Sequence, residues 1–146
     1  MKRRKQRDLL VKAVFAHFFQ TDLSVNEIFD SLLENFAEEP LTQGERENYL
    51  DPLIDQLVTD ESLYQELIQN HLKKTWKLER IARLDLAILE VAVSEIKNLA
   101  EVPFDVTVNE AVDLAKLYST EKSPSFVNGI LVQIFDEVNQ DDSDNS

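Results

Sequence analysis

The residues with the clearest chemical potential are the arginines near the N-terminus. On a helix that turns about 100° per residue, Arg4, Arg7 and Phe15 fall on one narrow stripe, and Arg3 lies beside it. Guanidinium groups bind phosphates through paired hydrogen bonds, and an aromatic ring on the same stripe can stack an unpaired base. The pattern is typical of a single-stranded nucleic-acid contact. A solvated basic end with Phe15 in the core explains the spacing equally well.

Charge is unevenly distributed along the 146 residues, which carry 28 acidic and 15 basic side chains and a net charge of −13. Residues 1–12 hold six basic residues and one acid, and residues 71–83 hold five basic residues and one acid. An acidic body with a basic end and a basic waist can bind an anion locally and repel it elsewhere. The second cluster is also compatible with a solvated helix face, and Trp76 beside it is expected to be a packing anchor.

No residue pattern indicates catalysis or a metal site. The chain has no cysteine, which excludes a disulfide, a thiol nucleophile and a cysteine-bound metal. His17 and His71 lie too far apart in the sequence to form a local metal pair, and no nucleophile or phosphate-loop motif occurs. We therefore expect neither an enzyme nor a cofactor. No apolar run approaches the ~18–20 residues of a membrane span, so we expect a soluble cytoplasmic protein.

Helical periodicity runs through almost the whole sequence, and no segment of useful length alternates with a period of two. Three capping boxes of the form S/T-x-x-E predict helix starts at Ser24, Thr42 and Thr107. The seven predicted helices begin near Arg4, Ser24, Thr42, Thr59 or Asp60, residue 79, Thr107 and Ser123. We predict an all-α fold with one domain over residues 1–140 and a disordered acidic tail at 141–146.

Two residues inside these helices predict local features. Pro52 lies within a helical pattern, so we expect a kink or an early break there. Gly129 lies inside the last helix, where glycine costs about 1 kcal/mol relative to alanine. Close packing of a neighbouring helix is the simplest explanation for this glycine, and close approach of another backbone is the alternative.

The segment 102–134 resembles the signature region of the NusB family of bacterial transcription antitermination factors. The family pattern P-x-x-V-x-I-N-E-A-V-E-L-A-K, followed by F-V-N-G, is matched in order by Pro103, Val106, Asn109, Glu110, Ala111, Val112, Leu114, Ala115, Lys116, Phe126, Val127, Asn128 and Gly129. The N-terminal arginines and the central stretch 78–96 also fit, so the resemblance covers nearly the whole chain. Glu90 stands where the family usually has arginine, and Ser94 replaces a tyrosine.

The resemblance implies about seven helices in two packed bundles and a function in transcription. Such proteins bind a single-stranded boxA element in nascent RNA together with the small-subunit ribosomal protein that serves as NusE. The assembly joins the antitermination complex on RNA polymerase and suppresses premature termination, chiefly on ribosomal RNA operons. Carried over by position, the implied RNA contacts are Arg3, Arg4, Lys5, Arg7, Phe15, Lys116, Lys122, Phe126 and Asn128. Asp85 matches an acidic position that faces the ribosomal protein.

Other functions stay compatible with the sequence. An acidic helical adaptor that binds only proteins would use the acidic faces, with the arginines serving solubility. An RNA-modifying enzyme is a weaker alternative, because NusB-like domains also occur ahead of methyltransferase domains, but no strand-rich region or cofactor loop follows here. Some members of the family dimerise through the face that otherwise meets RNA, so a homodimer is a further alternative.

Overall fold

The helix α5, from Arg83 to Asn98, runs through the middle of the molecule. The structure is a computed structural model that describes residues 1–73 and 77–144, with side chains up to residue 139. Every residue of α5 from Asp85 to Glu95 is buried. Its neighbours are α1 (Arg3–His17), α4 (Asp51–Asn70), α6 (Phe104–Tyr118) and α7 (Ser123–Asp144). The described residues form only helices and their connections, which confirms the predicted all-α fold.

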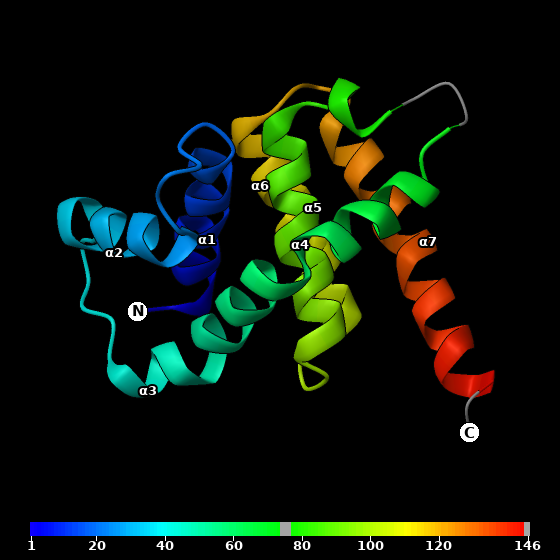
Figure 1. Cartoon of the computed structure of the whole chain (residues 1–146). Coiled ribbons are helices and arrows are strands. Elements are labelled where there is room, and N and C mark those ends of the chain that lie inside the picture. Colours follow the sequence, from blue (N-terminus) through cyan, green and yellow to red (C-terminus); the bar gives the residue numbers. More distant parts are fainter. Residues whose placement is uncertain (74–76, 145–146) are drawn as a thin grey trace.

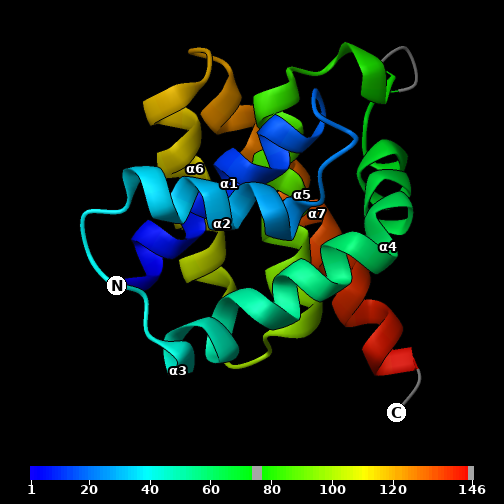
Figure 2. The ribbon, with the colours of Figure 1, turned by 60° about the vertical axis from the view of Figure 1, so that its left-hand side comes forward.

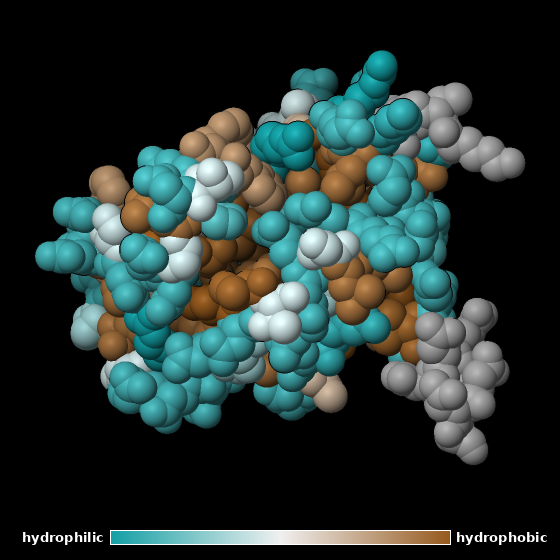
Figure 3. All heavy atoms as spheres, in the orientation of Figure 1, coloured by the Kyte–Doolittle hydropathy of each residue, from teal (hydrophilic) through white to brown (hydrophobic). Residues whose placement is uncertain are grey.

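The remaining helices pack on two sides of α5. Figure 1 shows α1, α2 (Val25–Phe36) and the short α3 (Gln43–Glu45) to one side, with α7 on the other. In the turned view of Figure 2, α2 crosses over α1, and α6 lies behind them. The face in Figure 3 is largely hydrophilic, with apolar atoms gathered in a recess between α2 and α4. Two helical groups that share α5 correspond to the two packed bundles that were predicted.

Two of the three predicted capping boxes are formed. The Ser24 and Thr42 hydroxyls accept hydrogen bonds from the backbone N–H groups of Glu27 and Glu45, and the glutamate carboxylates accept from the cap N–H groups in return. Each box satisfies two N–H groups that a helix start leaves free. These local interactions place the starts of α2 and α3 where the sequence predicts them.

The third predicted capping box, at Thr107, is wrong. Pro103 precedes the first residue of α6, Phe104, and Thr107 is a buried residue inside the helix. Proline is compatible with a helix start because its missing N–H would find no partner there. The helix cap therefore lies four residues earlier than predicted, at Pro103 instead of Thr107, and Glu110 is free to pair with arginines of α1.

The predicted disturbance at Pro52 lies in the turn before it. Residues Arg46–Leu50 form a π-helical turn that leads into α4, and Pro52 is in the first turn of α4. Asp60 has non-helical angles (φ −115°, ψ 16°), so α4 kinks at the boundary predicted near Thr59 or Asp60. The helix predicted from residue 79 begins later, because Leu78–Arg80 form a 3₁₀ turn and Ile81 is extended. The 3₁₀ turn and the extended Ile81 thus delay the start of α5 to Arg83.

No helix among the described residues is long and apolar enough to cross a membrane. The helix α7 begins at Ser123, as predicted, and extends to Asp144. The side chains of the acidic tail at 141–146 lie outside the described residues, so its predicted disorder stays a prediction. Trp76 and Lys74 also lie outside the described residues.

Candidate RNA-binding surface

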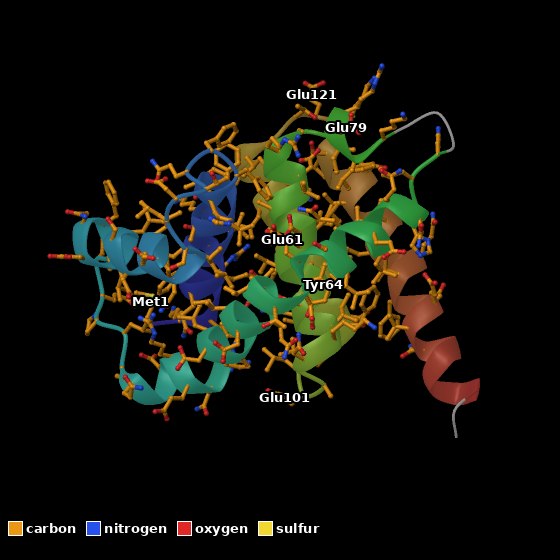
Figure 4. The ribbon with its side chains drawn as sticks, viewed as in Figure 1. Met1, Glu61, Tyr64, Glu79, Glu101 and Glu121 are labelled. Atoms are coloured by element: carbon orange, nitrogen blue, oxygen red, sulfur yellow. The ribbon has the colours of Figure 1, made fainter. Side chains whose placement is uncertain are left out.

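The first turn of α1 presents three basic side chains to solvent. Arg3, Arg4 and Lys5 are all exposed. Their position is fixed by Met1, whose ammonium group lies 2.6 Å from a Glu45 carboxylate oxygen and 3.2 Å from the carbonyl oxygen of Pro40. This ion pair lowers the pKa of Glu45, chiefly through the hydrogen bond from the ammonium group. Figure 4 shows Met1 beside the connection between α2 and α3, so the basic turn is anchored at its base.

Arg4 is exposed but already faces acidic neighbours on α6. Its side chain is 63% exposed and forms ion pairs with Glu110 (3.2 Å) and Asp113 (2.5 Å). Exposed pairs of this kind contribute little to stability because water screens them, so a phosphate can replace the carboxylates at low cost. Arg3 stacks over the Tyr49 ring at 5.0 Å. Lys5 has no ion pair or hydrogen bond among the described residues, which leaves its ammonium group available to a ligand.

The expected phosphate contact by Arg7 does not fit its position in the structure. The Arg7 side chain is only 4% exposed, and its Nε and Nη2 atoms donate hydrogen bonds to Glu95 of α5 at 2.5–3.2 Å. Its guanidinium group also lies 5.3 Å from the Tyr49 ring centre. A buried arginine held by both oxygens of a buried carboxylate has few donors left for RNA. We interpret Arg7 as a structural residue that joins α1 to α5.

Phe15 is half-buried and packs against the core, as the alternative to an RNA contact predicted. Its ring meets the edge of Phe19 at 5.3 Å between centroids, and Phe19 is the more exposed of the two. Sequence reasoning missed Phe19 because the predicted stripe stopped at Phe15. It also missed Tyr118, whose ring lies under the Lys12 ammonium group and whose hydroxyl donates to Asp8.

The residues expected to form a second wall of the RNA track lie on α6, on α7 and in the loop between them. Lys116 is exposed near the end of α6, Lys122 is exposed in the loop just before α7, and Asn128 is exposed near the start of α7. Because Arg4 pairs with Asp113, the basic turn of α1 lies beside the half of α6 that carries Lys116. Phe126 is half-buried and borders a hollow of about 360 Å³. His71, Leu72 and Ile130 also line this hollow.

Gly129 borders the same hollow. A Cβ atom at this position would meet nothing within 4 Å. The expected close packing of a neighbouring helix against Gly129 is therefore wrong. The other explanation for this glycine, close approach of another backbone to the open space beside it, stays a prediction.

Asp85 does not lie on an open face, contrary to the expectation that it meets the ribosomal protein. It is 6% exposed, and its carboxylate oxygens accept hydrogen bonds from Ser119 (2.6 Å) and Ser123 (2.8 Å). The Ser123 hydroxyl also lies 2.9 Å from that of Thr120. Asp85 thus ties the loop between α6 and α7 to the start of α5. We interpret it as a residue that positions this loop, because carboxylates accept such hydrogen bonds strongly.

The basic waist is exposed in its described part. Lys73, Lys77, Arg80 and Arg83 all face solvent, and the Arg83 guanidinium group lies 6.0 Å from the Phe18 ring centre. His17 hydrogen-bonds through Nδ1 to the Leu23 carbonyl oxygen at 2.8 Å, which gives this histidine a structural role. The described residues contain no group of three or more His, Cys, Asp or Glu side chains that could hold a metal ion.

Comparisons with known proteins agree with this architecture. A family model described as the NusB family matches residues 4–136. Proteins named transcription antitermination protein NusB are 39% identical in Bacillus cereus, over 93% of this chain and 98% of the relative, and 34% identical in Alkaliphilus oremlandii, over 90% and 91%.

Solved structures give the same result. The NusB structure of T. maritima has a TM-score of 0.81 and 33% identity, and the match covers 94% of this chain and 92% of that one. A structure described as antitermination factors NusB and NusE in complex with dsRNA has a TM-score of 0.78 at 24% identity, with coverage of 94% and 99%, and supports the fold alone. Fold and surface thus define an all-helical protein with a basic helix start. The chain belongs to the NusB family.

Proposed function

We propose that this chain is a transcription antitermination factor that binds a boxA-type single-stranded RNA together with a ribosomal protein in the role of NusE. The observation that carries the proposal is the exposed basic turn of Arg3, Arg4 and Lys5 in a chain with a net charge of −13. Relatives over nine-tenths of the chain are named for transcription antitermination, and one structural neighbour is described as NusB and NusE in complex with dsRNA. The assembly would act in the cytoplasm on RNA polymerase, chiefly on ribosomal RNA operons.

The proposed RNA contact is an exchange of ion-pair partners. A phosphate would displace Glu110 and Asp113 from Arg4 and would meet the unpaired ammonium group of Lys5. Lys116 on α6, Lys122 in the loop before α7 and Asn128 on α7 would extend the contact along the neighbouring helices. The half-buried rings of Phe15 and Phe126 would offer only their exposed edges to bases. Single-stranded RNA is bound by this combination of basic groups and aromatic surfaces.

The proposed contact with the ribosomal protein is electrostatic in character. The acidic body suits a basic partner, because complementary charge steers association. Asp85 would act indirectly, by holding the loop between α6 and α7 in place. A protein-binding adaptor without RNA affinity is the alternative, and a homodimer that covers the basic turn would compete with RNA.

The test is binding of a boxA-like single-stranded RNA across a salt series, with and without the ribosomal protein. We expect weak binding that tightens with the partner and weakens with salt. Replacing Arg3, Arg4 and Lys5 together with alanine should reduce the salt slope by about 2, since each lost phosphate contact contributes about 0.7 for single strands. The matched control removes three exposed basic groups elsewhere, at Lys73, Lys77 and Arg80.

Equal loss of affinity in both triple variants would mean that only net charge matters. No RNA binding by the unchanged protein in either condition would favour the acidic adaptor. Light scattering of the free protein, at the concentrations used for binding, identifies a homodimer directly.

A further inference from the structure

A hollow of about 400 Å³ lies between α1 and the C-terminal end of α2, beside the basic turn. Its volume is in the range of sites that bind small molecules. The residues that line it are Met1, Lys5, Asp8, Leu9, Lys12, Leu32, Phe36, Ala37, Glu38 and Glu39. Neither the charge pattern nor the family resemblance drew attention to this hollow, because its two walls are separated in the sequence.

The walls of the hollow combine apolar and aromatic surface. Leu9 is buried and Leu32 half-buried, whereas Phe36 is 72% exposed at the end of α2. A phenylalanine ring left in water offers both a large apolar area and a flat face. Stacking a nucleobase on such a ring is favourable for any base, because every base has a flat π-face.

The lining of the hollow carries charges of both signs. Lys5 is unpaired among the described residues, whereas Lys12 is paired with Asp8 at 2.9 Å. Glu38 and Glu39 follow α2 and are exposed. Lys5 attracts a phosphate, whereas the two carboxylates repel one. Carboxylates accept hydrogen bonds from base amino groups, so the two glutamates suit the edge of a base.

Lys5 also borders a second, smaller hollow on its other side. This hollow has a volume of about 140 Å³ and lies between α1 and α6, where Leu117 and Tyr118 contribute exposed surface. Lys5 thus borders two hollows, each lined by both apolar and charged side chains. A single strand whose phosphate meets Lys5 can turn a base toward either hollow.

We propose that the α1–α2 hollow binds one unpaired nucleobase of the RNA, stacked on Phe36, with the adjoining phosphate on Lys5. The inference rests on the proposed RNA-binding function and adds a base-binding pocket to it. Glu38 and Glu39 favour a base with an amino group at its Watson–Crick edge, which disfavours uracil. Both walls belong to this chain, so base binding in the pocket would not require the partner protein.

The experiment combines Phe36→Ala with a set of boxA-like RNAs that each carry one abasic nucleotide. In the unchanged protein, one abasic position should weaken binding by about tenfold, the effect of losing one stacked base. Phe36→Ala should weaken binding of the intact RNA by a similar factor. At that abasic position the variant and the unchanged protein should then bind equally, because the stacking partner is already missing.

Leu63→Ala is the control, since Leu63 is an exposed apolar residue on α4 outside both hollows. It should leave the whole abasic series unchanged. If Phe36→Ala fails to fold, Phe36→Leu keeps an apolar side chain, removes the flat ring and gives the same test.

The outcomes separate the two proposals. Salt-sensitive binding that Phe36→Ala leaves intact, or weakens equally for every abasic RNA, overturns the pocket and retains the RNA-binding function. Absence of RNA binding by the unchanged protein overturns both. Conversion of a dimer to a monomer by Phe36→Ala, without an effect on RNA, would show that a second copy occupies the hollow and would also overturn the proposal.

Discussion

Two arginines of α1 pair with carboxylates in different surroundings, Arg4 at the exposed start of the helix and Arg7 against the buried middle of α5. Arg4 is exposed and pairs with the exposed Asp113 and the half-buried Glu110. Glu95 in α5 is buried and holds Arg7, one helical turn further along α1. An exposed pair can exchange its partner for a ligand, whereas breaking a buried pair leaves an unpaired charge without water. Position relative to α5, rather than residue type, separates the proposed binding residues from the structural ones.

The strongest test of this contrast is removal of the buried pair. Arg7→Ala should lower the free energy of unfolding by about 3–5 kcal/mol, because the Glu95 carboxylate is left buried and alone. Arg4→Ala should change it by less than about 1 kcal/mol. Urea unfolding followed by circular dichroism measures both. If the Arg7→Ala protein were fully stable but had lost its RNA affinity, Arg7 would be a phosphate-binding residue and not a structural one.

Glu90 provides a pH-dependent test within α5. It is fully buried, and one of its carboxylate oxygens has no hydrogen-bond partner among the described residues. Burial raises the pKa of Glu90 to about 9, together with the nearby Glu61 of α4, which Figure 4 labels. The folded protein therefore keeps this carboxyl group protonated at pH values where the unfolded chain releases the proton. The stability that protonated Glu90 allows is complete below about pH 4.5 and is lost as pH rises toward about 9.

Glu90→Gln should remove this dependence, since the amide cannot ionise. As the pH rises from 6 to 8, we expect the free energy of unfolding of the variant to gain about 1–2 kcal/mol relative to that of the unchanged protein. One titrating group can contribute at most about 1.4 kcal/mol per pH unit. Urea unfolding of both proteins at several pH values gives the difference. A difference that does not vary with pH would mean that Glu90 ionises normally.

Asp85 tests whether a buried carboxylate can position a functional loop. Asp85→Ala should cost about 1–3 kcal/mol, because the Ser119 and Ser123 hydroxyls lose their acceptor. Amide hydrogen exchange in the loop between α6 and α7 should accelerate. Unchanged stability and loop exchange, combined with lost binding of the ribosomal protein, would instead place Asp85 in the partner interface.

The smallest expected effect is at Gly129. Gly129→Ala should raise the free energy of unfolding by about 1 kcal/mol, because a helical glycine is replaced where a Cβ meets open space. Thermal unfolding measures the gain. Loss of partner binding in a stabilised variant would show that the hollow beside Gly129 receives another backbone.

Local interactions explain which helix starts could be predicted. Ser24 and Thr42 cap their helices through residues three positions away, so the sequence contains both partners of each bond. Thr107 matches the same pattern, but Pro103 allows an earlier start. Ser123 begins α7 as predicted, while its hydroxyl donates to Asp85, which is 38 residues away. The helix starts thus followed local signals, whereas the positions of Arg7 and Asp85 depended on partners that are distant in the sequence.

The sequence by itself determined the helices, the concentration of basic residues at the start of α1 and the family resemblance, because these depend on neighbouring residues and on residue order. Periodicity placed Arg4 and Arg7 on one stripe and could not distinguish them. Only the tertiary structure decided that Arg7 is buried, because its partner Glu95 lies 88 residues away. The hollow beside Phe36 likewise exists only where α1 and α2 pack together, since burial and enclosure depend on contacts between distant segments.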